Sequence, residues 1–180
     1  IVNMLKMIWR NYGTIIKYIA IQSNIPEKVI VSFIAVESGG NPEAGPAGHI
    51  TQGLTQFNRD FAQELLEKEY AQKRLTSGEK QLLAKYGITF DANGKTRAIT
   101  NKDQLIPELN ILIGAIILGQ MIDTDWGTEN NQIKLERVIA VYNAGAYGDT
   151  GKKARSKQYE TALDLASAVN GVTRGYIQKM

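Results

Sequence analysis

One carboxyl group stands out in this sequence by its surroundings. Glu37 closes the stretch VIVSFIAVE (29–37), which is otherwise apolar except for Ser32, and it is the only charged residue between Lys28 and Glu43. Burial disfavours the ionised form of a carboxyl group and raises its pKa. A rise of two units corresponds to about 2.7 kcal/mol and keeps much of the group protonated near neutral pH. Such a group can act as a general acid on a poor leaving group, for example a sugar oxygen. The alternative is a helix-end residue turned toward water.

The composition excludes several other kinds of chemistry. The 180 residues include no Cys, which rules out thiolate chemistry, iron–sulfur clusters and Cys-based zinc sites. His49 is the single histidine, so a cluster of His ligands is also excluded. It lies in the loop sequence GPAGH (45–49), where we expect it to be exposed to solvent. We expect no metal and no other cofactor.

Glu37 begins a series of short motifs that extends over most of the chain. In order they are ESGGNP (37–42), GLTQ (53–56), NILIG (110–114), AVYNAG (140–145) and RGYI (174–177). In this order and approximate spacing, the set resembles the soluble lytic transglycosylase family. These are lysozyme-like enzymes, related to goose-type lysozyme, that cut bacterial peptidoglycan. The resemblance covers the chain from Val29 to Ile177.

The resemblance implies roles for four residues in the first half of the chain. Glu37 matches the sole catalytic acid/base of the family, and Ser38 matches the residue that supports it in the cleft. Gly53 and Gln56 match the loop that forms the floor of the groove, where Gln56 presents its amide to the sugar. The alternative for Gln56 is that it only caps a loop.

Three further residues follow later in the chain. Tyr142 and Asn143 match the tyrosine and asparagine that face the acid and contact the substrate. Tyr176 matches a late tyrosine whose hydroxyl lies close to the catalytic carboxyl group. Read without the resemblance, a tyrosine that ends an apolar helix is more often part of a core, and Asn-Ala-Gly is a common helix C-terminus.

Some positions depart from the family pattern. Thr55 replaces the usual Met, which predicts a smaller and more polar groove wall. Gly40 stands where a bulky residue is common, and Ile117 stands where a Tyr is common. The segment 66–100 is longer than the family requires. These departures affect the expected grip on the substrate more than the expected reaction.

The motifs provide one catalytic acid. Retaining and inverting glycosidases normally use two carboxylates. No second acid occurs within the five motifs, and the one candidate beside them that we single out is Glu108, close to Asn110. Nothing in the sequence directs Asp60, Asp123, Asp125 or Asp149 toward Glu37. The resemblance therefore implies cleavage of the N-acetylmuramic acid–β-1,4–N-acetylglucosamine bond with formation of a 1,6-anhydromuramic end. Two alternatives remain: a goose-type lysozyme that uses an Asp-held water, and a non-catalytic domain that binds peptidoglycan.

Charge and hydropathy exclude a nucleic-acid partner and a membrane-spanning segment. With 21 Lys+Arg and 18 Asp+Glu the net charge is +3. This charge is too low, and the basic residues are too scattered along the chain, for a nucleic-acid binder. The longest apolar run, 109–122, is too short to span a bilayer, and no signal peptide is visible. The family resemblance implies that the partner is peptidoglycan glycan strands outside the cytoplasm, and that the chain acts in the periplasm or as a domain of a phage virion or secretion machine.

Helical periodicity dominates the sequence. We expect helices over 4–22, from Pro26 to Glu37, from Asn58, from Thr76 to Gly87, from Pro107, over 129–142, and two short ones in 156–180. Asn93-Gly94 between two alternating stretches predicts a β-hairpin over 88–99. The sequence thus predicts a mainly α, lysozyme-like fold in a single domain, residues 1–180. Within it, 25–65 and 105–180 carry the core motifs and 66–100 forms a family-variable insertion.

Overall fold

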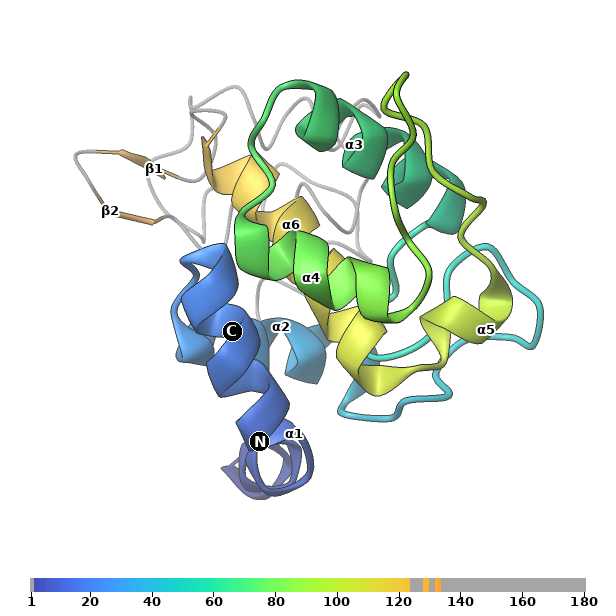
Figure 1. Cartoon of the computed structure of the whole chain (residues 1–180). Coiled ribbons are helices and arrows are strands. Elements are labelled where there is room, and N and C mark those ends of the chain that lie inside the picture. Colours follow the sequence, from blue (N-terminus) through green and yellow to red (C-terminus); the bar gives the residue numbers. More distant parts are fainter. Residues whose placement is uncertain (1, 124–127, 130–131, 134–180) are drawn as a thin grey trace. The chain divides into compact units, whose positions relative to one another are not determined.

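A computed structural model of the chain describes residues 2–123, 128–129 and 132–133. The chain forms two compact units, Ile1–Ile117 and Leu118–Met180. The structure is mainly helical, as the sequence predicts. Its elements, shown in Figure 1, are α1 (Val2–Ser23), α2 (Glu27–Ser38), α3 (Arg59–Ala71), α4 (Ser77–Lys85), α5 (Asn101–Gln104), α6 (Pro107–Asp123), β1 (Thr128–Glu129) and β2 (Gln132–Ile133).

The helices begin where the sequence offers capping side chains. The Asn58 side chain accepts hydrogen bonds from the backbone N–H groups of Asp60 and Phe61 at the start of α3. Thr76 accepts one from Glu79 at the start of α4. Thr100 and Asp103 form a complete capping box around the first turn of α5. These caps satisfy N–H groups that have no partner within the helix.

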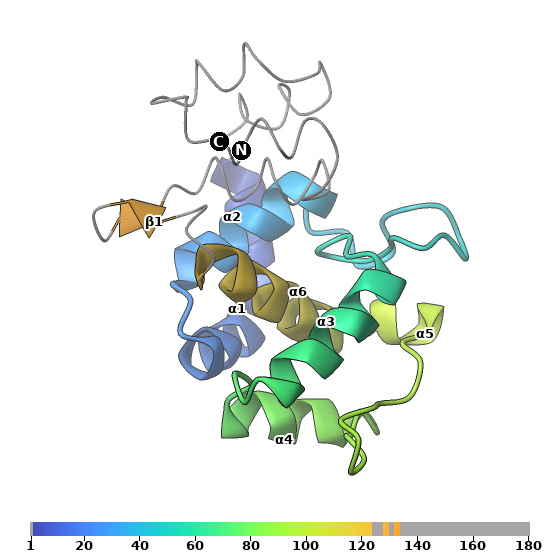
Figure 2. The ribbon, with the colours of Figure 1, turned by 90° about the horizontal axis from the view of Figure 1, so that it is seen from above.

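The core of the first unit forms around α6. From Leu109 to Ile117 this helix is almost completely buried on all sides, which explains why it shows no amphipathic pattern. Figure 2 shows its first half between the α1–α2 pair and the α3–α4 pair. Helix α1 contributes one apolar face, with Ile8, Ile16 and Ile19 fully buried, and it packs against α2 and α4.

The expected hairpin over 88–99 is wrong, because this segment contains no strand. Asp91 accepts hydrogen bonds through Oδ1 from the backbone N–H groups of Asn93 and Lys95, at 2.8 and 2.9 Å. Glu67 of α3 accepts another from the N–H of Thr96. Side chains therefore occupy donors that a second strand would have used. Within the turn only Gly94 has a positive φ, +74°, whereas a type I′ turn needs two such residues.

A small hairpin lies instead between β1 and β2, which pair antiparallel with Thr128 opposite Ile133. The expected start of a helix at Glu129 is therefore wrong. The part of that helix from residue 134 onward and the two short helices of 156–180 lie outside the described residues.

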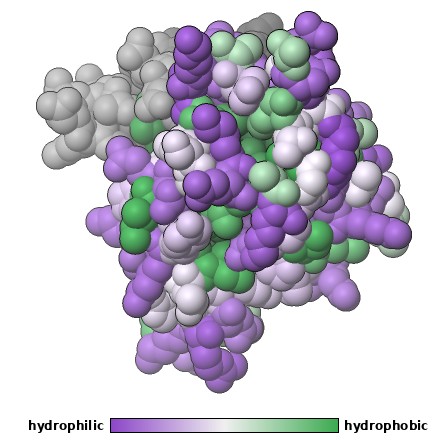
Figure 3. All heavy atoms as spheres, viewed as in Figure 1, coloured by the Kyte–Doolittle hydropathy of each residue, from purple (hydrophilic) through white to green (hydrophobic). Residues whose placement is uncertain are grey.

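The surface of the described part is mixed. Figure 3 shows hydrophilic side chains interrupted by smaller hydrophobic areas on the face seen in Figure 1. In the part of the chain that the structure describes, no individual helix has the length and apolar character needed to cross a bilayer. Helices α1 and α2 reach that threshold only when taken together, and they are bent by 120°.

Candidate functional site

The backbone around Glu37 is fixed by the end of α2. Gly39 adopts a left-handed conformation, with φ +63°, and its N–H donates to the carbonyl of Ala35. The Ser38 hydroxyl donates to the carbonyl of Ile34 and accepts from the N–H of Gly40, both at 3.1 Å. Ser38 thus holds the last turn of the helix that carries Glu37.

Gly40 lies where α1 approaches this turn most closely. A Cβ at Gly40 would lie 2.7 Å from Cγ1 of Ile8 and 2.8 Å from Cε of Met7. The Tyr12 hydroxyl also donates to the Gly40 carbonyl, at 3.4 Å. The bulky residue that is common here in the resembled family would not fit, because α1 occupies its space.

The Glu37 carboxyl group is strongly perturbed. The residue as a whole is half-buried, but its Oε1 atom is inaccessible to solvent and has no hydrogen-bond partner among the described residues. Burial raises the pKa of Glu37 from 4.5 to about 8. The group is therefore mostly protonated at neutral pH, which agrees with the first of the two alternatives that the sequence left open.

The loop that carries Gly53 and Gln56 is held together by the Gln56 amide. Its Nε2 donates to the carbonyls of Ala44 and Gly53, each at 2.8 Å, and the backbone of Gln56 has a φ of +50°. A residue other than glycine in this conformation is uncommon and often marks a functional or strained position. Because both N–H groups serve the loop, only the carbonyl oxygen of this amide is left to receive a hydrogen bond from a ligand.

Gly53 fits a space that no side chain could share. Its φ is +85°, and a Cβ would lie 2.3 Å from the carbonyl oxygen of Gln104 and 2.4 Å from Nδ2 of Asn110. Its N–H donates to Ala44 at 2.9 Å. Gly53 and Gln56 are thus brought together in one loop. No hydrogen bond among the described residues joins either of them directly to Glu37 or Ser38.

Thr55 points into the protein and not into a groove, so its expected role as a groove wall is wrong. The residue is fully buried, and its N–H and hydroxyl both donate to Oδ1 of Asn110 at 2.8 Å. A Cβ at Gly114 would lie 2.6 Å from the Thr55 hydroxyl. Asn110 and Gly114 lie one turn apart on α6, so the two ends of the NILIG motif form the seat of the GLTQ loop.

Buried amides around Asn110 complete this seat. Nδ2 of Asn110 donates to the carbonyls of Gln52 and Gln104, at 3.1 and 2.7 Å. Nε2 of Gln104 donates to the carbonyls of Ile50 and Phe57, at 2.9 and 2.8 Å. The sequence pointed to Asn110 as a polar residue in an apolar run. Gln104 gave no such signal, because its partners are about fifty residues away.

Glu108, the candidate for a second acid that the sequence places beside a motif, is already paired with other side chains. Oε1 of Glu108 accepts from Lys85 Nζ at 2.6 Å and from the Tyr86 hydroxyl at 2.7 Å. These bonds lower the pKa of Glu108. Asp60 is exposed in the first turn of α3. The Asp123 side chain, Asp125 and Asp149 are not described.

The remaining site predictions have different outcomes. His49 is exposed, as expected, with Nδ1 3.0 Å from the Thr51 hydroxyl. No three His, Asp or Glu side chains within the described residues are grouped so that they could hold a metal ion. Tyr142, Asn143 and Tyr176 lie outside the described residues, so their roles stay predictions.

Comparisons with known proteins do not assign the chain to a family. No family model matches the sequence, and no curated protein matches it.

Proposed function

We propose that this protein is a peptidoglycan lytic transglycosylase with Glu37 as its single acid/base. The observation that carries the proposal is the carboxyl group of Glu37, which has a buried, unpartnered oxygen and a pKa of about 8. A neutral carboxyl group at the end of a rigid helix is suited to protonate a glycosidic oxygen. The ordered series of motifs in the sequence supports the choice of substrate.

The proposed reaction needs no second protein carboxylate. Glu37 donates its proton to the β-1,4 oxygen as the C1–O bond breaks, and the N-acetyl carbonyl of the muramic residue stabilises the cation that develops at C1. The ionised Glu37 then takes the proton of the C6 hydroxyl, whose oxygen bonds to C1. The product is a 1,6-anhydromuramic end, and water is not consumed. The same raised pKa that keeps Glu37 protonated makes its carboxylate a competent base for the second step.

The surrounding residues have supporting parts in this proposal. Ser38 and Gly39 hold the helix end that carries the acid. Gln56 offers a carbonyl oxygen to a sugar hydroxyl or amide, while Gly53 shapes the loop. For Tyr142, Asn143 and Tyr176 the proposal adopts the contacts that the family resemblance implies.

Glu37→Gln separates an enzyme from a binding domain. Glutamine has the same shape but cannot transfer a proton, so the variant should lose at least ~100-fold of its cleavage rate and still bind purified peptidoglycan. The matched control is Glu27→Gln, which removes the acid at the opposite end of the same helix and should retain activity. Full activity of Glu37→Gln would contradict the proposal. Binding without cleavage by the unmodified protein would favour the non-catalytic domain.

A further inference from the structure

The outer face of α1 carries cations and no acid. Val2, Lys6, Arg10, Lys17 and Ile21 are separated by four or seven residues, so they share one face of the helix, and all five are exposed. Helix α1 contains neither Asp nor Glu. The cations thus form a stripe with an apolar residue at each end, Val2 being 64% exposed and Ile21 74%.

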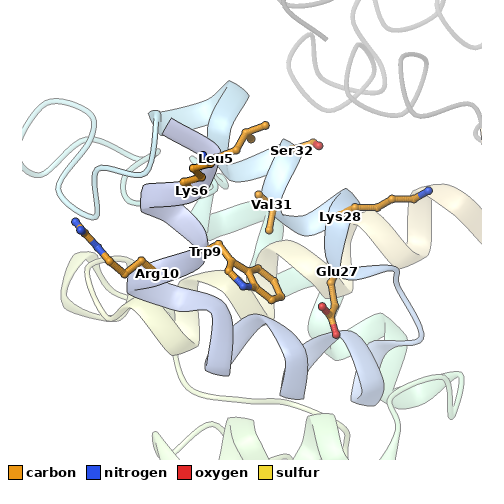
Figure 4. Close-up of a pocket in the computed structure, with 8 residues that line it drawn as sticks. All are labelled: Leu5, Lys6, Trp9, Arg10, Glu27, Lys28, Val31 and Ser32. Atoms are coloured by element: carbon orange, nitrogen blue, oxygen red, sulfur yellow. The ribbon is translucent and has the colours of Figure 1, made fainter. Parts of the chain in front are cut away.

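A groove of about 710 Å³ runs beside this stripe, between α1 and α2. Leu5, Trp9 and Val31 supply its apolar lining, and Lys6, Arg10 and Lys28 lie along its rim. Figure 4 shows the Trp9 ring between the two helices, with the Arg10 and Lys28 side chains extending outward. Glu27 is the one acid that lines the groove.

The Trp9 ring lies against the surface of its own helix. A Cβ at Gly13 would be 3.2 Å from Cδ2 of Trp9, so the glycine leaves room for the ring. Lys17 Nζ lies 5.4 Å from the ring centroid, in a cation–π contact. Trp9 as a residue stays 38% exposed despite these contacts, so an amphipathic aromatic side chain lines the same groove as Lys6, Arg10 and Lys28.

We propose that the stripe and the α1–α2 groove form a docking surface for an anionic phospholipid bilayer. Lys and Arg side chains near such a bilayer are attracted by its negative surface potential. Tryptophan prefers the boundary between headgroups and acyl chains. A hydrated polyanion would satisfy the cations but would gain nothing from Val2, Ile21 and the apolar groove. The surface does not involve Glu37, so this proposal is independent of the proposed enzymatic function.

The test uses the intact chain and two kinds of vesicle. One kind consists of phosphatidylcholine alone, and the other of phosphatidylcholine and phosphatidylglycerol in equal parts. The protein should cosediment with the anionic vesicles only, and less at high salt. The variant Lys6→Gln/Arg10→Gln/Lys28→Gln should bind these vesicles roughly 100-fold more weakly. A control variant with the same loss of charge, Lys68→Gln/Lys80→Gln/Lys102→Gln, changes exposed lysines elsewhere and should keep most of the affinity. Equal weakening of both variants would overturn the proposal, as would equal binding to both kinds of vesicle or to neither.

Tryptophan fluorescence tests the apolar part of the contact. The chain has two tryptophans, so Trp126→Phe leaves Trp9 as the only emitter. On addition of anionic vesicles its emission should shift to the blue, and brominated acyl chains should quench it. If polyglutamate in solution competes with the vesicles while Trp9 is not quenched, the surface recognises polyanions and the membrane proposal is wrong.

Discussion

At the scale of single residues, Glu37 should make the stability of the protein depend on pH. Its pKa is about 8 in the folded chain, against 4.5 for the ordinary group. A carboxyl group with a raised folded-state pKa favours folding fully below pH 4.5, and this contribution falls as the pH rises toward 8. Glu37→Gln removes the dependence. We expect the variant to exceed the unmodified protein in free energy of unfolding by a margin that grows from pH 5 to pH 8, reaching at most roughly 3 kcal/mol at pH 7.

Urea unfolding of both proteins at several pH values measures this margin. Glu79 also has a raised pKa, about 7, but it is present in both proteins and cancels in the difference. A margin that stays constant from pH 5 to pH 8 would show that the Glu37 carboxyl is not perturbed, and the acid role would lose its physical basis.

At the scale of elements, the GLTQ loop should depend on the absence of a side chain at Gly53. Gly53→Ala adds the conformational free energy of an alanine in the left-handed region. It also forces the new Cβ against the Gln104 carbonyl oxygen and the Asn110 side chain. Gly48→Ala is the matched control, because Gly48 also has a positive φ, +73°, but a Cβ there meets no atom within 4 Å. Thermal unfolding should show a loss of about 1 kcal/mol for Gly48→Ala and a clearly larger one for Gly53→Ala. Similar losses would contradict the close packing described for this loop.

The stability of the same loop should also depend on the Asn110 side-chain amide. Asn110→Asp keeps the shape but replaces the donor that serves the carbonyls of Gln52 and Gln104 with a buried anion. We expect a loss of about 3 kcal/mol or more in the free energy of unfolding at neutral pH, with partial recovery in acid. Asn41→Asp is the control, since Asn41 is exposed and its side-chain oxygen accepts a bond from Glu43 that aspartate can also accept. A neutral effect of Asn110→Asp would mean that the amide seat contributes little.

At the scale of the whole molecule, local signals in the sequence predicted the helices well and the connections less well. The caps at Asn58, Thr76 and Thr100 are encoded within a few residues, and each one starts a helix. For Glu37 the sequence left burial and exposure to water open, and the structure buries one of its two carboxyl oxygens. The hairpin at 88–99 failed because Glu67, about thirty residues earlier, caps the chain there.

The buried amides that hold the GLTQ loop could not be predicted from local sequence either, because their partners lie far away along the chain. Gln104 bonds to Ile50 and Phe57, and Thr55 bonds to Asn110, so these contacts exist only after the chain has folded. Of the five motifs, the structure joins GLTQ to NILIG through Thr55 and Asn110. The motifs did not predict that Thr55 turns inward. For Gln56 the sequence left a role on the substrate and a role within the loop open, and in the structure its amide donates within its own loop.

The central claim is that Glu37 drives cleavage without water as a reactant, and mass spectrometry of the products tests it directly. Purified peptidoglycan is digested in ¹⁸O-water, and the new muramic ends are analysed with and without borohydride reduction. The account predicts 1,6-anhydromuramic ends that carry no ¹⁸O, resist reduction and are absent with Glu37→Gln. Reducible ends labelled with ¹⁸O would contradict it, because they would show that water is the nucleophile.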